Sequence, residues 1–200
     1  MTRFLRNAAV IAMGAALLLP LAACVSVTSA PAGAFKVGTG AYHVTLGQEW
    51  SDISQIMLAR PKNVRLLSLD GPSLNRLYLT DGLAPGDFLV KPAAKDKPTP
   101  TYQKGMSATE LVEFVADSVS ALDYQKVETS GLRPTRLAGA EGLRFDLKGK
   151  TREGLEISGA AALAERGGKL YVILYLAPQE HYFQATLPEV ESVMGSASAG

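Results

Sequence analysis

The stretch Lys169-Leu-Tyr-Val-Ile-Leu-Tyr-Leu-Ala-Pro178 decides the fold of this 200-residue chain. It is apolar almost without interruption from Leu170 to Leu176. Strands with one face in water alternate apolar and polar residues, whereas a continuous apolar run is typical of a strand covered on both faces. We therefore expect residues 169–177 to form a central strand of a β-sheet, with other elements packed on both sides of it.

Further strands are predicted just before this one. They cover residues 125–129, 142–148 and 155–165. A bend through Gly131 and Pro134 follows the first of them, and glycine-containing turns at 149–154 and at Arg166-Gly167-Gly168 separate the later ones. Short turns of this kind join neighbouring antiparallel strands, so the last three strands are predicted to form an antiparallel meander.

A helix is predicted before these strands. Ser107 and Glu110 have the spacing of a capping box, in which the side chain of each residue bonds the backbone N–H of the other. The apolar residues that follow recur at helical intervals. They are Leu111, Phe114, Val115, Val119 and Leu122. We expect this helix over about residues 108–122.

A second helix is predicted to close the chain, over about residues 178–194. Phe183, Leu187, Val190 and Met194 are spaced for one helical face, and Pro188 is expected to open a second helical piece.

The N-terminal half is predicted to add a strand and a hairpin. Tyr42, Val44 and Leu46 alternate with polar residues in a strand over 41–46. The hairpin has strands over 64–69 and 74–80, joined by the turn Asp70-Gly71-Pro72-Ser73. Residues 83–105 mix prolines with lysines, which disfavours both helix and strand, so a loop is expected there.

The chain begins with the features of an export signal. Arg3 and Arg6 precede an uncharged apolar stretch over residues 8–19, and small residues lead from there to Cys24. The apolar stretch ends at Pro20 and is shorter than the about twenty residues that a membrane-spanning helix needs. A cleaved signal is therefore predicted, and no permanent span.

Leu21-Ala22-Ala23-Cys24 resembles the lipobox of bacterial lipoproteins. The resemblance implies that fatty chains such as palmitate are attached at Cys24 and that cleavage follows Ala23. Val25 and Ser26 come next, in place of the aspartate that would resemble an inner-membrane retention signal. We therefore expect a lipid anchor in the outer membrane that faces the periplasm. The alternative is that Cys24 is a small buried residue in the tail of an ordinary signal peptide.

One domain is expected in the mature chain. The predicted parts are a signal peptide over residues 1–23, a lipid-anchored flexible tether over 24–37, a single α/β domain over 38–195 and a disordered tail over 196–200. The 20 Lys+Arg and 19 Asp+Glu residues leave no electrostatic footprint for nucleic acid. Cys24 is the only cysteine, so the domain is expected to form no disulfide.

The order of the predicted elements resembles the PsbP-like group, which is named for a lumenal protein of photosystem II and includes Ran-binding nuclear import factors and many bacterial lipoproteins. Lys169–Pro178, followed by Tyr182, Phe183 and Leu187–Met194, looks like the final strand and helix of that group. Ala41-Tyr42-His43-Val44 followed by Trp50-Ser51 looks like its opening strand and turn. The resemblance implies an α+β fold in which an antiparallel sheet lies between helices, an α/β/α sandwich. It implies no single activity.

Sequence signatures of catalysis and of metal binding are missing. No Gly-x-Ser-x-Gly nucleophile elbow and no glycine-rich phosphate loop occurs. His43 and His181 lack the spacing of metal ligands and are interpreted as surface residues of a strand and of a helix start. We therefore predict no catalytic residue, no metal site and no cofactor, and we expect the chain not to be an enzyme.

Several residues leave other roles open. Acid and base partners can lie far apart in sequence, so six carboxylates are candidates for such a pair, although a turn-stabilising role is expected for each. They are Asp52, Asp70, Asp81, Asp87, Glu141 and Asp146. Four aromatic residues either line a ligand groove or belong to the core, the core being expected for Trp50. They are Trp50, Tyr42, Tyr78 and Tyr102. The lysines over 91–104 either lie in a solvated loop or contact phosphate-bearing envelope surfaces.

These observations favour a non-catalytic cell-envelope lipoprotein that acts as a binding or scaffold module for a protein partner in the periplasm. The alternative is a carrier that holds a lipid or another amphiphile in an apolar pocket. A cell-wall hydrolase is the third hypothesis, and it depends on a catalytic pair among the carboxylates.

Overall fold

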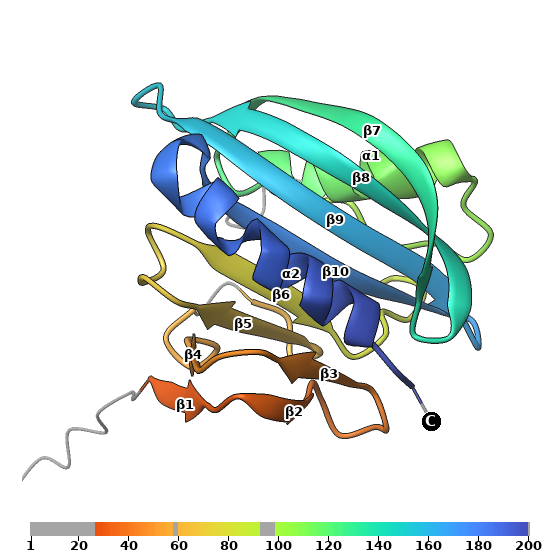
Figure 1. The fold of residues 1–200 in the computed structure, drawn as a ribbon. Helices are drawn as coiled ribbons and strands as arrows, with labels where there is room; N and C mark the ends of the chain where they lie inside the picture. Colours follow the sequence, from red (N-terminus) through yellow and green to blue (C-terminus); the bar gives the residue numbers. More distant parts are fainter. Residues whose placement is uncertain (1–26, 58–59, 93–98, 200) are drawn as a thin grey trace, which may run out of the picture.

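The computed structural model describes residues 27–57, 60–92 and 99–199 (Figure 1). The elements are, in chain order, β1 (Thr28–Ala30), β2 (Gly33–Lys36), β3 (His43–Leu46), β4 (Trp50–Asp52), β5 (Val64–Ser68), β6 (Arg76–Thr80), α1 (Ala108–Ser120), β7 (Gln125–Leu137), β8 (Ala140–Lys150), β9 (Glu156–Arg166), β10 (Lys169–Pro178), the π-helical turn η1 (Gln179–Phe183) and α2 (Gln184–Ser196).

β10 lies inside an eight-stranded antiparallel sheet with the order β1-β4-β5-β6-β10-β9-β8-β7. Tyr175 is paired with Leu77 of β6 on one side and with Ala160 of β9 on the other. The side chains of β10 alternate between the two faces of the sheet, and those from Leu170 to Leu176 are buried except for the half-buried Tyr171. The prediction of a central strand covered on both faces is therefore confirmed.

The two helices cover opposite faces of this sheet, as Figure 1 shows, with α2 in front and α1 behind. On one face Phe114 and Val115 of α1 belong to the same buried cluster as Leu174. On the other face Val190 of α2 belongs to the same cluster as Tyr175. The predicted α+β class, an antiparallel sheet between helices in an α/β/α sandwich, is confirmed.

The helix α1 begins as the capping box predicts. The Ser107 hydroxyl accepts a hydrogen bond from the Glu110 N–H, and the Glu110 carboxylate accepts one from the Ser107 N–H. The helix ends at Ser120, slightly before the expected Leu122.

The closing helix differs from the prediction at its start. Residues 179–183 form the π-helical turn, in which His181 has φ 68° and ψ −59°, and the regular helix starts at Gln184. Pro188 therefore lies inside α2 and does not open a second piece. A positive φ breaks the α-helical path, which explains why the helix starts later than the apolar spacing predicted.

A buried arginine fixes α2 to the sheet. Arg144 of β8 is only 4% exposed, and its Nη2 lies 2.6 Å from the Glu191 Oε1 of α2. Its Nη1 lies 2.9 Å from the Asp146 Oδ1 of the same strand. Both acids therefore compensate the buried guanidinium, since an unpaired charge is costly in the interior.

The flexible tether predicted over residues 24–37 is wrong from Thr28 onward. β1 pairs with β4, so that Ala30 lies opposite Trp50, and β2 pairs with β3 in a separate two-stranded sheet. Ala30 is 1% exposed. These strands form because a few apolar residues in a polar stretch reach the core. The Ser, Thr, Pro and Gly content of the stretch indicated a flexible tether instead.

The predicted disordered tail over 196–200 also needs correction, because Ser196 belongs to α2 and Ser198 pairs with β3. The His43 N–H donates to the Ser198 carbonyl at 2.9 Å, and the Ser198 N–H donates to the His43 carbonyl at 3.0 Å. Backbone pairing with a strand orders this end of the chain, which its small-residue composition could not indicate.

The strand predicted over 125–129 is the start of a longer one. β7 runs from Gln125 to Leu137 and passes through the expected bend at Gly131 and Pro134 by shifting its register with β8 between Ser130 and Arg133. Gly131 has φ 62°, which suits such a bulge. A bulge keeps the strand paired, so the bend does not end it.

Candidate functional site

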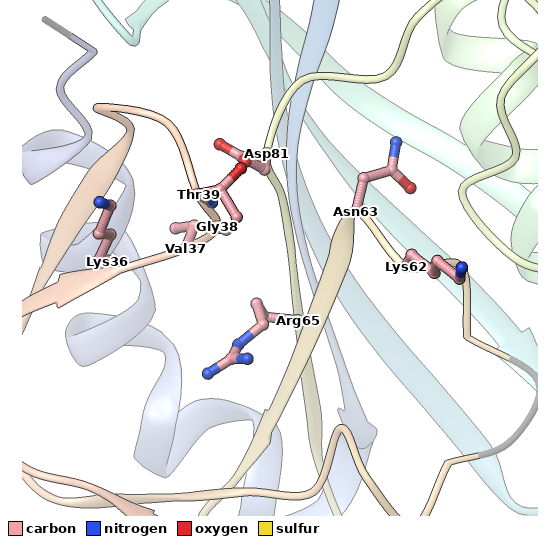
Figure 2. Close-up of a pocket in the computed structure, with 8 residues that line it drawn as sticks. All are labelled: Lys36, Val37, Gly38, Thr39, Lys62, Asn63, Arg65 and Asp81. Carbon is pink, nitrogen blue, oxygen red and sulfur yellow. The ribbon is translucent and has the colours of Figure 1, made fainter.

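A cavity of about 450 Å³ lies between the β2–β3 hairpin tip and the ends of β5 and β6 (Figure 2). Lys36 and Thr39 come from the hairpin, and Arg65 comes from the start of β5. Lys62 lies just before β5, and Asp81 directly follows β6. We call this cavity the hairpin cleft. Three cations and one carboxylate line it, so its walls carry an excess of positive charge.

The Arg65 guanidinium is fixed in the hairpin cleft by neighbours. Its Nη2 lies 2.6 Å from the Asp52 Oδ2, and its guanidinium carbon lies 5.6 Å from the centre of the Phe35 ring. The Arg65 Nε is buried and makes no hydrogen bond within the described part of the chain. Arg65 therefore contributes a fixed positive charge to the wall of the hairpin cleft, and Asp52 already pairs with part of it.

The two lysines of the hairpin cleft keep their ammonium groups free. Lys36 and Lys62 are exposed, and neither takes part in an ion pair within the described residues. They come from opposite walls of the hairpin cleft, as Figure 2 shows. Either ammonium group can therefore contact an anion without displacing an existing partner.

Asp81 fixes the hairpin tip. Its Oδ2 accepts a hydrogen bond from the Thr39 N–H at 3.1 Å. A Cβ atom on Gly38 would lie 1.9 Å from that same Oδ2, so the close approach requires glycine at this position. The contact places the tip and its Lys36 beside the ends of β5 and β6.

A second cavity, of about 370 Å³, adjoins the hairpin cleft and shares Thr39 and Asp81 with it. Tyr42, Lys169 and Tyr171 line it, together with Arg166. We call it the tyrosine cleft. Arg166 donates hydrogen bonds to the carbonyls of Ala138 and Ala199.

Tyr42 is the most unusual side chain of the tyrosine cleft. It is 2% exposed, its ring centre lies 4.9 Å from that of Tyr171, and its hydroxyl makes no hydrogen bond within the described residues. Burial raises the pKa of the Tyr42 hydroxyl, and the nearby Tyr171 and Asp81 raise it further. The hydroxyl is therefore neutral at physiological pH and can donate one hydrogen bond.

The lipidation site falls outside the described residues. Cys24 and the cleavage position after Ala23 precede the first described residue, Val27. Both stay predictions.

The two histidines lie where the sequence placed them. His43 is exposed on β3 and His181 is exposed in η1. Across residues 27–57, 60–92 and 99–199, no group of three His, Cys, Asp or Glu side chains is arranged to hold a metal ion.

Each of the six candidate carboxylates makes local hydrogen bonds or ion pairs. Asp70, Asp81 and Asp87 accept hydrogen bonds in turns or loops, from Asn75, from Thr39, and from Ala84 and Asn63 respectively. Asp52, Glu141 and Asp146 form ion pairs with Arg65, Arg136 and Arg144 respectively. The turn-stabilising interpretation is confirmed for Asp70 and Asp87, and Asp81 combines a structural contact with a place between the two clefts.

The four aromatic candidates do not form one groove. Tyr42 and Trp50 lie in the cluster on the α2 face, whereas Tyr78 and Tyr102 lie in the cluster on the α1 face. All four are at most 3% exposed, which confirms the core interpretation of Trp50. Of the proline- and lysine-rich segment, Lys91 and Lys104 are exposed, and residues 93–98 lie outside the described residues.

Sequence reasoning missed the cations of both clefts. Lys36 was assigned to the tether, and Lys62, Arg65 and Lys169 occur at ordinary strand ends that carry no local motif. Two residues that line the clefts were among the sequence candidates, Asp81 as a carboxylate and Tyr42 as an aromatic residue. These residues meet only because the β2–β3 hairpin folds over the ends of β5, β6 and β10.

Solved structures with this fold are known. The Ran-binding protein Mog1p of Saccharomyces cerevisiae is 9% identical, with a TM-score of 0.53 over 88% of this chain and 96% of that one. The cyanobacterial PsbP (CyanoP) of Synechocystis sp. PCC 6803 is 13% identical, with a TM-score of 0.50 over 95% and 99%. The chain therefore has the Mog1/PsbP-like fold. At these identities the likeness shows the fold alone.

LpqN of Mycobacterium tuberculosis, described as involved in cell envelope biogenesis, gives a lower TM-score of 0.35 at 14% identity, over 86% of this chain and 90% of that one. No protein-family model matches the sequence, and no curated protein matches it either.

Neither described helix is long and apolar enough to cross a membrane.

Proposed function

We propose that the chain is a non-catalytic binding module of the cell envelope, anchored by lipid at Cys24, and that the hairpin cleft binds an anionic group of a partner. The observation that carries this proposal is the set of three cations around one open cavity, of which Lys36 and Lys62 have no ion-pair partner within the described chain. Unpaired cations on opposite walls of a cleft attract anions and raise their local concentration.

Helices cover both faces of the sheet, and this favours the binding-module hypothesis over the hypothesis of a lipid carrier. Residues of both sheet faces belong to buried clusters with the helices, so the helices already cover the apolar surface of the sheet. An apolar cavity of about 270 Å³ between the start of α1 and β8 and β9 opens to solvent, whereas carriers bury most of their ligand's surface.

The local partners of the six candidate carboxylates support a non-catalytic role over a hydrolase. A general acid and a general base need side chains that face a substrate across a cleft. Asp52 instead pairs with Arg65 and bonds the Ser54 N–H, and Asp146 pairs with Arg144. These contacts occupy the oxygens that catalysis would need.

The binding test uses the full-length chain in detergent, titrated with a hexaglutamate peptide and with inorganic phosphate. Backbone NMR shifts are expected at the hairpin tip and at the start of β5, and affinity should fall as salt rises. The double variant Lys36→Gln/Lys62→Gln should weaken peptide binding by about tenfold or more, since each lost charge contact contributes of the order of 1 kcal/mol.

A matched control removes two exposed lysines elsewhere, Lys126 and Lys148, as Lys126→Gln/Lys148→Gln. This variant has the same net charge as the cleft variant and should bind as the native chain does. Equal losses in the two variants would show that binding depends on total charge, and the proposed cleft would then be wrong.

The lipid anchor has its own test. Metabolic palmitate labelling should mark the native protein and not the Cys24→Ser variant, and the variant should leave the membrane fraction, because stable anchoring requires the acyl chains. An unlabelled native protein would contradict this part of the proposal without affecting the cleft.

A further inference from the structure

Tyr42 of the tyrosine cleft has a buried hydroxyl that makes no hydrogen bond within the described residues. A buried hydroxyl without a partner is destabilising, and most such groups in folded proteins are paired. Phenylalanine would pack the same ring at this position without that cost. The Tyr42 hydroxyl, which lines the tyrosine cleft beside Asp81 and Tyr171, therefore points to a ligand that supplies the missing partner.

The two clefts also share a wall with an unused acceptor. Thr39 and Asp81 line both, and only the Oδ2 of Asp81 accepts a hydrogen bond within the described residues. The tyrosine cleft adds Lys169, which is exposed and has no ion-pair partner in the described chain. Each cleft therefore combines at least one unpaired lysine with the shared carboxylate of Asp81.

We infer that the hairpin cleft and the tyrosine cleft together bind one extended acidic segment of a partner protein. One of its carboxylates lies between Lys36 and Lys62, a backbone N–H between the acidic residues donates to Asp81, and a second carboxylate lies beside Lys169 and accepts the Tyr42 hydroxyl proton in a hydrogen bond. This inference rests on the proposed function, because it extends the ligand of the hairpin cleft into its neighbour.

An extended peptide matches this combination of groups. Side chains at alternate positions of a strand point to the same face, about 7 Å apart, and backbone N–H groups lie between them. Both clefts are open to solvent and adjoin along the surface, which suits a chain lying across them. Small ligands instead prefer pockets that enclose most of their surface.

The test compares three blocked peptides on the full-length chain in detergent by calorimetry. Their sequences are Gly-Glu-Gly-Glu-Gly, Gly-Glu-Gly-Gln-Gly and Gly-Gln-Gly-Gln-Gly. The doubly acidic peptide should bind about tenfold more tightly than the singly acidic one, because it engages both clefts. Lys169→Gln should remove that advantage and leave the affinity for the singly acidic peptide unchanged.

Tyr42→Phe separates a binding role from a structural one. Loss of the hydroxyl should weaken the doubly acidic peptide severalfold, while the midpoint of urea unfolding stays the same or rises because an unpaired buried group is removed. A lower midpoint with unchanged peptide affinity would assign the hydroxyl a structural role and overturn its part in the site.

The outcomes distinguish the two proposals. Equal affinities for the singly and doubly acidic peptides would overturn this inference and leave the hairpin cleft as the anion site. Failure of both acidic peptides to bind at low salt would overturn the proposed function as well. Binding to phosphatidylglycerol vesicles that depends on Lys36, Lys62 and Lys169, without peptide binding, would identify a lipid surface and contradict an acidic protein segment.

Discussion

At the scale of single residues, Arg144 shows how one buried charge joins two elements. Its guanidinium contacts Glu191 of α2 and Asp146 of β8, and its side chain is almost completely buried. A buried ion pair contributes little compared with an apolar replacement, but removing one partner leaves a charge that the interior disfavours.

We therefore expect Glu191→Gln to lower the free energy of unfolding by about 1 to 3 kcal/mol, measured by urea titration. The matched control is Glu141→Gln, which removes one partner of the exposed Arg136–Glu141 pair. Exposed pairs contribute at most about 1 kcal/mol, so this control should change stability little. Equal effects of the two substitutions would contradict the bridging role of Arg144.

Gly38 gives a second prediction at this scale. Because a Cβ atom there would meet Asp81, Gly38→Ala should move the hairpin tip and lower the free energy of unfolding by about 1 to 3 kcal/mol. Gly195→Ala is the control, since its Cβ would meet nothing within 4 Å. In an Asp81→Gly background, which already lacks the Thr39 contact, Gly38→Ala should cost little further, and an undiminished loss there would show that the clash is not its cause.

At the scale of elements, α1 and β10 were predicted because their signals are local. A capping box and a continuous apolar run describe their own secondary structure without reference to other segments. β2 has no such signal, because Phe35 is the only large apolar residue between Ala30 and Val37. Lys36 was missed for the same reason, whereas Asp81 and Tyr42 of the candidate site were among the sequence candidates.

The start of α1 predicts a pH dependence. Hydrogen bonds with Ser107 lower the pKa of the Glu110 carboxyl below its ordinary value. A carboxyl with a lowered folded-state pKa adds stability above its unfolded-state pKa, and this contribution is lost as pH falls through the folded-state value. Glu110→Gln should therefore destabilise the chain at pH 7, with a difference from the native chain that shrinks below about pH 4.

Thermal unfolding across pH 3 to 7 measures this difference. The control is Glu113→Gln, in the same helix, whose exposed carboxylate makes no hydrogen bond within the described residues. Ser107→Ala should cost about 1 kcal/mol at pH 7, the usual effect of losing an N-cap. A Glu110→Gln difference that stays constant down to pH 3 would contradict the capping-box explanation.

At the scale of the whole molecule, the layered architecture followed from the order of helices and strands, whereas the way the termini close the fold did not. Backbone pairing holds Ser198 to His43, which is far away in sequence. It also holds β1 to β4. Such pairing leaves no side-chain pattern, so composition suggested a tether and a tail instead.

Hydrogen exchange tests this closure. The amide protons of His43 and Ser198 donate to each other's carbonyls and should exchange more slowly than those of exposed loop residues such as Gly105. Replacing Ser198 by proline removes one donor, and protection at His43 should then fall while that of Val172 in β10 is kept. Unprotected His43 and Ser198 amides in the native chain would show that the C-terminal end is not paired.

If Cys24 carries the proposed lipid anchor, the early start of β1 limits how far the folded domain can lie from the bilayer. An extended chain spans at most about 3.5 Å per residue. The four residue steps from an acylated Cys24 to Thr28 therefore allow a separation of at most roughly 14 Å. A tether reaching to residue 37 would have been more than three times as long. The folded domain would therefore lie close to the lipid headgroups, and its motion relative to the bilayer would be restricted. Its partner would have to present the acidic segment at that short distance from the membrane.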